Sequence, residues 1–293
     1  MEKIKFLTDS ACDLPQELAD RYDIQIVPIP ITIDGEGYYE RVDFTPWEFY
    51  DRLASAKELP STSHVTNVQF AQYYQEIYEA GYTDVIHVTI NSKGSNMYQA
   101  ANMAKEMFFE EHPQAKETFH IYIIDSLGYT FMYGQGLLEM GRMRQEGKSA
   151  KELVQWMENY VQRVVVYFAP YTLEYAKRSG RINCAAAFVG EVLGLRPIIR
   201  IHKGEMTIVE KVRGDRNVVL KIRDQYLAHG DKMAPYTILH GKEEAPGKEL
   251  ATLLSQELGQ EPQGIYPVGA SITINAGPRV VAVVGLLREG ETL

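Results

Sequence analysis

Apolar, β-branched runs alternate with helix-like patterns through the first half of the chain, which is typical of βαβ units and a mainly parallel sheet. We expect strands at residues 4–7, 24–33, 85–90 and 119–124. Helices are expected at residues 15–22 with Asp13 as the cap, after a capping box at Thr66 and Gln69, from Met97 onward, and over 130–143. Pro28 and Pro30 should confine the second strand to a sheet edge or a bulge, and residues 35–39 should be irregular.

The pattern changes near Arg163. Strands are expected at residues 164–168, 198–201, 207–212, 236–240 and 280–287, joined by hairpins and with fewer helices between them. A chain of 293 residues is also long for one core. We therefore expect two α/β domains, 1–162 with a mainly parallel sheet and flanking helices, and 163–293 with more antiparallel strands.

Two polar dipeptides, Asp9-Ser10 and Asp125-Ser126, follow strand-like runs. The carboxyl ends of parallel strands meet at one rim, where open α/β sheets bind ligands. Capping of the next helix explains the same residues equally well, so both interpretations stay open.

The net charge of −9 argues against nucleic acid and anionic membrane as partners. Residues 171–223 differ, with eleven Lys and Arg against five Asp and Glu, a local charge of +6. Cys12 and Cys184 lie far apart and form no metal or redox motif, which fits a reducing cytoplasm. We see neither a signal segment nor an apolar run near the ~18 residues of a membrane helix, so we expect a soluble, cytoplasmic protein without stable membrane insertion.

Most enzyme signatures are missing: the sequence has no GxxxxGK[ST], HExxH or GxSxG motif. Gly134, Gly136 and Gly141 do not fit a dinucleotide fingerprint and are interpreted as close-packing positions in a helix. The seven histidines have no metal-ligand spacing, and only His87 and His240, near strand ends, merit attention. We therefore expect no metal and no cofactor.

Hydroxyl-rich segments precede two helices, at residues 60–63 (PSTS) and 91–95 (NSKGS). Hydroxyls and free N–H groups at helix starts bind anions such as a carboxylate, although the same residue types also serve as ordinary caps. The presence of two such segments after separate strands favours an anion site.

Several short motifs occur in the order known from one family. They are TDS and DLP at residues 8–15, PSTS at 60–63, SNMYQAA at 95–101, DS at 125–126, SGRI at 179–182, RPI at 196–198, EKVR at 210–213, GA at 269–270 and GPR at 277–279. With these motifs the chain resembles, over almost its whole length, the DegV family of fatty-acid-binding proteins, which includes the binding subunits of bacterial fatty acid kinase.

The resemblance implies a non-catalytic, two-domain protein that holds one long-chain fatty acid such as palmitate or stearate. Thr62 and Ser95 match the hydroxyls that hold the carboxylate in the family, and the hydroxyl-rich segments above include both. Further contacts with the head group or a partner are expected from Ser63, Arg213, Asn275 and Ala276.

The chain departs from the family pattern at two places in this site. Asn96-Met97 stand where the family has Gly-Thr, and Asn275 stands where the kinase-linked members have a histidine. An amide still donates a hydrogen bond but does not become cationic near neutral pH. Fatty-acid binding tolerates this change more easily than participation in kinase chemistry does.

Three functions follow as hypotheses. The first is a module that sequesters or presents a long-chain fatty acid; its tunnel residues would come from positions such as Met97, Ala101, Ala104 and Phe168, which also suit a plain core. The second is a carrier that presents the fatty acid to a separate fatty acid kinase. Its support is the set of basic residues Lys177, Arg178, Arg181, Arg213 and Arg216. The third, a hydrolase using Ser95 or Ser126, lacks an identifiable base.

Overall fold

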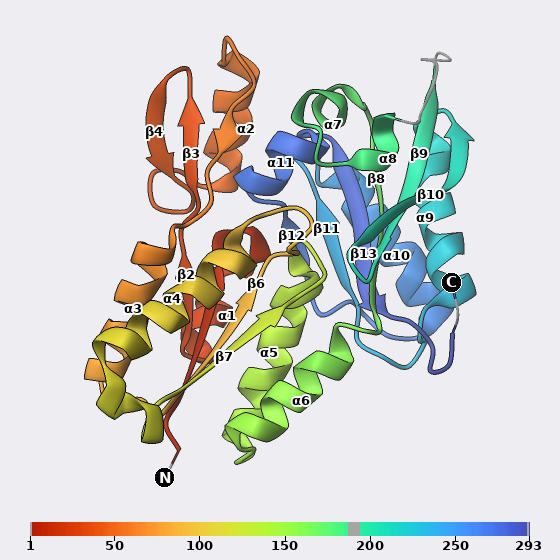
Figure 1. The fold of residues 1–293 in the computed structure, drawn as a ribbon. Coiled ribbons are helices and arrows are strands. Elements are labelled where there is room, and N and C mark those ends of the chain that lie inside the picture. Colours follow the sequence, from red (N-terminus) through yellow and green to blue (C-terminus); the bar gives the residue numbers. More distant parts are fainter. Residues whose placement is uncertain (1, 187–193, 292) are drawn as a thin grey trace.

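The computed structural model describes residues 2–186, 194–291 and 293 and confirms the predicted fold class. Within these residues the chain forms a parallel four-stranded sheet, a mixed six-stranded sheet and a small three-stranded sheet, with helices packed around them (Figure 1). The first sheet lies in the N-terminal half of the chain and the six-stranded sheet in the C-terminal half.

The four-stranded sheet has the strand order β2-β1-β6-β7, and all of its neighbours are parallel. Its strands are β1 (Ile4–Asp9), β2 (Ile24–Val27), β6 (Asp84–Thr89) and β7 (His120–Asp125). The helices of this half are η1 (Ser10–Cys12), α1 (Gln16–Arg21), α3 (Asn67–Glu79), α4 (Met97–Glu111), η2 (Pro113–Glu117), α5 (Phe131–Gln145) and α6 (Ala150–Tyr160). Helices α3 and α4 lie side by side on the outer face, while α5 and α6 lie on the side of the six-stranded sheet (Figure 1).

The small sheet has the order β4-β3-β5 and corrects two predictions. Its strands are β3 (Pro30–Ile33), β4 (Glu36–Tyr39) and β5 (Ser61–Thr62), and α2 (Pro46–Ser55) packs beside it. The single strand predicted over 24–33 is wrong: it divides around Pro28 into β2 and β3, which belong to different sheets. Residues 35–39 are also not irregular, because Asp34 and Gly35 both have positive φ and form the tight turn of a hairpin.

The six-stranded sheet has the order β10-β9-β8-β13-β11-β12 and is antiparallel except between β11 and β12. Its strands are β8 (Val164–Pro170), β9 (Leu195–His202), β10 (Glu205–Arg213), β11 (Thr237–His240), β12 (Ile265–Pro267) and β13 (Val280–Leu286). The helices of this half are α7 (Glu174–Ser179), α8 (Asn183–Ala186), α9 (Arg216–His229), α10 (Ala245–Leu258) and α11 (Ala270–Ala276). Helix α11 lies between α7 and α2, where the two halves meet (Figure 1).

The two faces of the six-stranded sheet serve different cores because successive strand residues point to opposite sides. Val166 and Phe168 belong to a core shared with the N-terminal half, whereas Val165 and Tyr167 pack in a second core with residues of α9 and α10. The alternation of side chains along β8 therefore separates the face that meets the N-terminal half from the face that its own helices cover.

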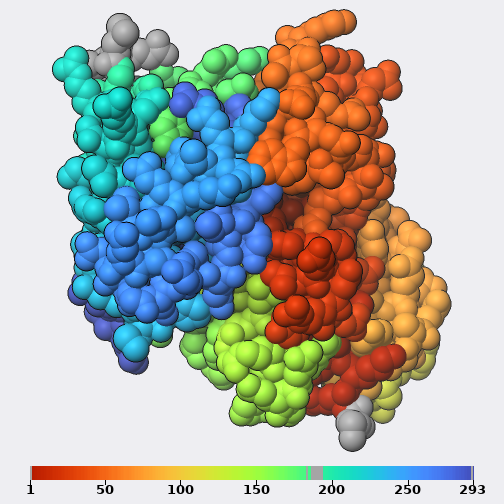
Figure 2. Space-filling model, turned by 180° about the vertical axis from the view of Figure 1, so that it is seen from behind, coloured from red at the N-terminus to blue at the C-terminus, as the bar shows by residue number. Residues whose placement is uncertain are grey.

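The change of sheet falls between α6 and β8, the region where the sequence predicts a boundary between 1–162 and 163–293. From behind, the N-terminal residues and the C-terminal residues form neighbouring lobes along a seam (Figure 2). Because one apolar core continues from the four-stranded sheet into β8 and β13, the division into two domains stays a prediction.

Of the local predictions for helix caps and glycines, one cap is wrong and the others are confirmed. The capping box of Thr66 and Gln69 is confirmed. Asp13 does not cap α1: Pro15 holds that position, and Asp13 has a left-handed φ of 53° that turns its carboxyl away toward Gly269. The close-packing role of the α5 glycines is confirmed, since a Cβ at Gly134 would stand 2.7 Å from the Cys12 carbonyl oxygen.

Candidate functional site

A cavity of about 480 Å³ lies between the two large sheets and is bordered by α11. Its volume lies within the roughly 300–1,000 Å³ of small-molecule sites. Most of its wall is apolar, and its aliphatic and aromatic lining comes from Ile29, Ile90, Met97, Tyr129, Val166, Phe168, Ile182, Ile201, Met206, Leu239, Val268, Ile272, Ala276, Val280 and Ala282. Such a wall suits an apolar chain.

Five strands of the six-stranded sheet, β8, β9, β10, β11 and β13, supply the floor of this cavity. Phe168 on β8 and Leu239 on β11 flank Ala282 on β13, in register on either side of it. Of the tunnel residues expected from the sequence, Met97 and Phe168 line the cavity, whereas Ala101 and Ala104 are fully buried in the core and lie outside its lining.

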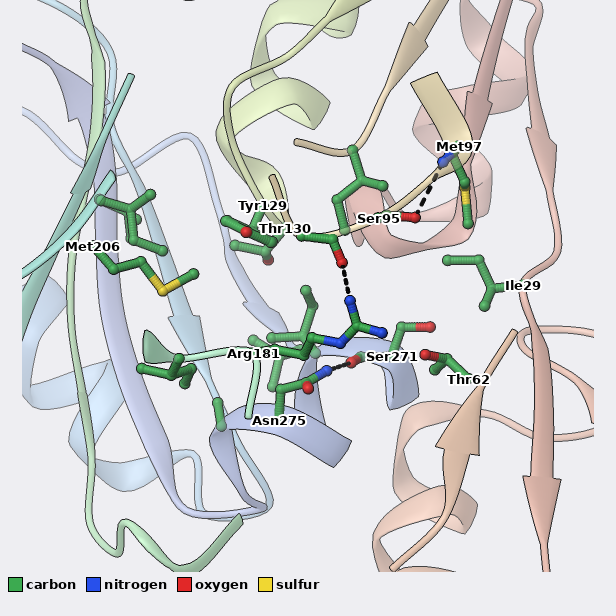
Figure 3. A pocket seen from close by; sticks show the side chains of 18 of the residues that line it. Ile29, Thr62, Ser95, Met97, Tyr129, Thr130, Arg181, Met206, Ser271 and Asn275 are labelled. Carbon is green, nitrogen blue, oxygen red and sulfur yellow. Dashed lines mark hydrogen bonds between the residues drawn. The ribbon is translucent and has the colours of Figure 1, made fainter. Parts of the chain in front are cut away.

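The polar groups gather at one end of the cavity. Thr62 and Ser271 lie on the right of the close view, Arg181 and Asn275 lie beside them near its middle, and Met206 lies on the left (Figure 3). Arg181 is the one Lys, Arg, Asp or Glu side chain among the described lining residues. The cavity therefore has a cationic, hydrogen-bonding end and an apolar remainder.

Thr62 is held at the polar end by the small sheet. It pairs with Ile31 of β3, and the next residue, Ser63, donates its N–H to the Pro30 carbonyl over 2.9 Å. Both Thr62 and Ser63 line the cavity and are exposed to it or to solvent. Within the described residues the Thr62 hydroxyl has no hydrogen-bond partner and is free to donate to a ligand.

Ser95 is presented by the loop before α4. Its N–H donates to the Asn91 carbonyl at 3.1 Å, and its Oγ accepts from the Met97 N–H at 3.3 Å. The Ser95 O–H is thus left to donate into the cavity. Asn96, at the cap position of this fifteen-residue helix, makes no capping hydrogen bond with its side chain, so the site keeps the positive end of the α4 dipole.

The two rim dipeptides anchor this loop and do not line the cavity. Asp9 Oδ2 accepts from the Ile90 N–H at 2.8 Å, and Asp125 Oδ1 accepts from the Ser92 N–H at 3.1 Å. Burial raises the pKa of Asp9 to about 6, although hydrogen bonds from Tyr133 and from backbone N–H groups oppose this effect. Asp9 and Asp125 thus lie at the carboxyl ends of β1 and β7, as the sequence predicts, and their side chains bind the backbone of the loop that carries Ser95.

Asn91 ties the Ser95 loop to the C-terminal half. Its side-chain amide donates to the Tyr129 hydroxyl at 3.1 Å and to the Gly204 carbonyl, in the β9–β10 turn, at 3.2 Å. Tyr129 also lies against Gly94, where a Cβ would collide with its ring and hydroxyl. Gly94 is therefore required for this close approach.

Helix α11 and Arg181 complete the polar end. The Asn275 side chain donates to the Ser271 carbonyl at 2.7 Å, and Ala276 lines the cavity one residue further along. Arg181 donates from one guanidinium nitrogen to the Gly94 carbonyl at 2.8 Å, and its other N–H groups have no described partner (Figure 3). An adjoining polar cleft of about 530 Å³ shares Thr62, Arg181 and Asn275 and opens this end to solvent.

Other residues singled out from the sequence lie elsewhere. Arg213 is exposed at the end of β10 and does not line the cavity. Ser126 bonds through its hydroxyl to Gly128, and within the described residues neither Ser126 nor Ser95 is hydrogen-bonded to a histidine. His87 is fully buried, and burial lowers its pKa to about 3; His240 bonds to the Gly241 carbonyl.

No group of three or more His, Cys, Asp or Glu side chains is arranged to hold a metal ion in residues 2–186, 194–291 and 293. None of the helices found in that same part of the chain combines the length and apolar content needed to cross a bilayer.

Comparison with known proteins gives a consistent family. The family model described as an uncharacterised protein of the DegV family matches residues 3–287. A DegV domain-containing protein of Clostridium perfringens is 31% identical over 284 residues, which cover 96% of this chain and 97% of that protein.

Two solved structures extend the comparison to the fold. A stearic acid-binding protein from Eubacterium ventriosum is 25% identical and superimposes with a TM-score of 0.87 over the full length of both chains. The fatty acid kinase B3 protein of Streptococcus pneumoniae, loaded with linoleic acid, shares the fold with a TM-score of 0.83 at 17% identity, covering 97% of this chain and 99% of that one. The chain belongs to the DegV family.

Proposed function

We propose that the protein binds one long-chain fatty acid, with its carboxylate at the Thr62 and Ser95 hydroxyls and its tail in the apolar part of the cavity. The observation that carries this proposal is the cavity itself, which joins two free hydroxyl donors and one arginine to a long apolar wall. The relative from Eubacterium ventriosum, a stearic acid-binding protein, supports a ligand such as palmitate or stearate.

The apolar part and the polar end of the cavity contribute differently to the free energy of binding. Each buried methylene contributes about 0.8 kcal/mol of transfer free energy, so the tail dominates the affinity. An unpaired carboxylate in this half-buried place would be costly, and the hydroxyl donors, the α4 dipole and Arg181 satisfy it. The protein then needs no catalytic residue or cofactor for this role. The free thiols of Cys12 and Cys184 support a cytoplasmic location.

The test is fatty-acid affinity after removal of the two hydroxyls, Thr62→Val and Ser95→Ala. A hydrogen bond to a charged group contributes about 1.5–3 kcal/mol, so each change should weaken binding at least tenfold without unfolding the protein. Ser92→Ala is the matched control, since Ser92 lies in the same loop but outside the cavity lining. Unchanged affinity in the double variant would refute the carboxylate site.

A second role, presentation of the fatty acid to a separate kinase, is favoured by the open polar cleft beside the carboxylate position. Arg178 and Arg181 line this cleft and place positive charge where an acyl phosphate would form. Ion pairs partly neutralise the basic segment: Arg178 pairs with Glu174, Arg196 with Asp215 and Lys221 with Glu210. Arg213 remains a candidate for contact with such a partner.

The kinase role is tested by incubating the loaded protein with a fatty acid kinase and ATP and measuring acyl phosphate. We expect product from the native protein and less from Arg181→Gln at equal loading. Absence of product with a kinase that is active on other carriers would remove this role and leave fatty-acid binding intact, and it would point to Asn275 as the reason.

A further inference from the structure

Two buried carboxyl groups meet at the start of α11. Asp13, from the N-terminal half, accepts the Gly269 N–H at 2.9 Å through Oδ1. Glu40, which follows β4, accepts the Ser271 N–H at 2.9 Å through Oε1. Asp13 is 8% exposed and Glu40 is 2% exposed, so the N-terminal half binds the start of α11 through hydrogen bonds that exclude water.

The remaining carboxyl oxygens of the pair are also fully engaged. Asp13 Oδ2 lies 2.5 Å from the Thr130 hydroxyl, and Glu40 Oε2 accepts from the hydroxyls of Ser10 and Ser271 at 2.6 Å each. Gly269 lets the two carboxyls approach the same point, because a Cβ there would stand 2.6 Å from Asp13 Oδ1 and 2.7 Å from Glu40 Oε1. Both carboxyls therefore form hydrogen bonds with the same short segment, residues 269–271, at the start of α11.

The negative charge of Glu40 beside a buried Asp13 favours the protonated form of Asp13. Burial, with the charge of Glu40 as the second cause, raises the pKa of Asp13 to about 8. The titratable groups that face the pair from the packed elements are Asp9, Cys12, Arg41, Tyr50 and Tyr133. The one cation among them, Arg41, directs its guanidinium to the Leu14 carbonyl and Gln16.

We propose that Asp13 and Glu40 are positioning residues of the fatty-acid site, which hold α11 in place through these buried hydrogen bonds while Asp13 carries a proton. This proposal rests on the proposed function, because α11 carries Ser271, Asn275 and Ala276 of the cavity wall. Thr130, the partner of Asp13, lines the same cavity. A bound carboxylate is thus a third carboxyl group, and a second negative charge, in this region.

Linkage then couples ligand binding to the proton of Asp13. Binding of the anion favours protonated Asp13, and ionisation of Asp13 at alkaline pH weakens binding by the same factor. Calorimetric titration of palmitate into delipidated protein at about pH 8, in two buffers of different ionisation enthalpy, measures the proton directly. We expect the native protein to take up a fraction of a proton and to lose affinity several-fold between about pH 7 and about pH 9.5.

Asp13→Asn separates this role from simple packing. Its amide oxygen can accept from Gly269 and its NH₂ can donate to Thr130, but it cannot ionise. The variant should take up no proton and should show no loss of affinity over this pH range. Because His64 also lines the cavity, His64→Gln is the matched control and should retain the uptake.

Each outcome decides a different claim. Uptake that persists in Asp13→Asn, or vanishes in His64→Gln, overturns the role of the pair. Binding by the native protein without proton uptake also overturns it, while the proposed function stands. Failure of the native protein to bind palmitate at any pH contradicts the proposed function instead.

Glycine variants give a second, independent measurement of the same contact. Gly269→Ala should weaken palmitate binding at least tenfold, because its Cβ forces both carboxyls away from α11. Gly37→Ala is the control, since nothing lies within 4 Å of a Cβ at that position. Equal affinities in the two variants would contradict the positioning role, and if Gly269→Ala does not fold, the pH profile of Asp13→Asn still decides.

Discussion

The buried carboxyl of Asp13 predicts how the free energy of unfolding depends on pH. Its pKa rises from the ordinary 3.8 to about 8 through burial and the charge of Glu40. Between these values the folded state keeps a proton that the unfolded state releases, so the stabilisation is complete below the lower value and is lost as the pH rises to the higher one. The slope for one such group is about 1.4 kcal/mol per pH unit.

Two other buried groups titrate in part of this window and nearly cancel. Burial raises the pKa of Asp9 to about 6, which adds a slope of the same sign below that pH. Burial lowers the pKa of His87 from 6.5 to about 3, which gives the opposite slope because the unfolded state binds the extra proton. Between about pH 6.5 and about pH 8, Asp13 therefore remains as the main buried contribution, about 2 kcal/mol in total.

The assay is urea unfolding of the delipidated protein at several pH values across that interval. The free energy of unfolding of the native protein should fall with pH relative to Asp13→Asn, and the difference should approach about 2 kcal/mol. Asp34→Asn, the same change at an exposed position, is the control and should follow the native curve. Parallel curves for the native protein and Asp13→Asn would refute the reasoning.

Two substitutions test the wall of the cavity and the loop that carries Ser95. Ala282→Phe places a ring on the cavity floor between Phe168 and Leu239. The affinity for stearate should then fall much more than the affinity for decanoate, by about fourfold for each methylene that the ring excludes from the cavity. An equal loss of affinity for both acids would contradict a tail in this position. Gly94→Ala drives a methyl group into Tyr129, so we expect a lower melting temperature and weaker palmitate binding; a variant with native stability and affinity would contradict the close approach.

The parts of the site that the sequence predicts are those set by local chemistry. Ser95 stands before α4, where hydroxyls and free N–H groups have a recognisable pattern. The same interpretation is wrong for Thr62, because residues 61 and 62 form the strand β5 and the next helix, α3, is capped by Thr66. Phe168, which the sequence suggests as a possible tunnel residue, lines the cavity, although β8 is buried at every position and its sequence does not distinguish its two faces.

The contacts that close the site depend on long-range packing and leave no local pattern. Arg181 reaches Gly94 across 87 residues, and Asp13 reaches Gly269 across 256. The pattern after Asp13 suits a helix cap, but its left-handed backbone and the buried donors of α11 redirect the carboxyl. Glu40 carries no sequence signal, because an isolated glutamate after an expected loop is indistinguishable from a solvated one.

The central claim is that this protein carries a long-chain fatty acid. Native mass spectrometry of the protein purified from cells under non-denaturing conditions tests it most directly. We predict a mass excess equal to one fatty acid of palmitate or stearate size, which is lost in Thr62→Val with Ser95→Ala although that variant remains folded. A native protein that carries no acyl ligand, and that acquires none when palmitate is added, would contradict the account.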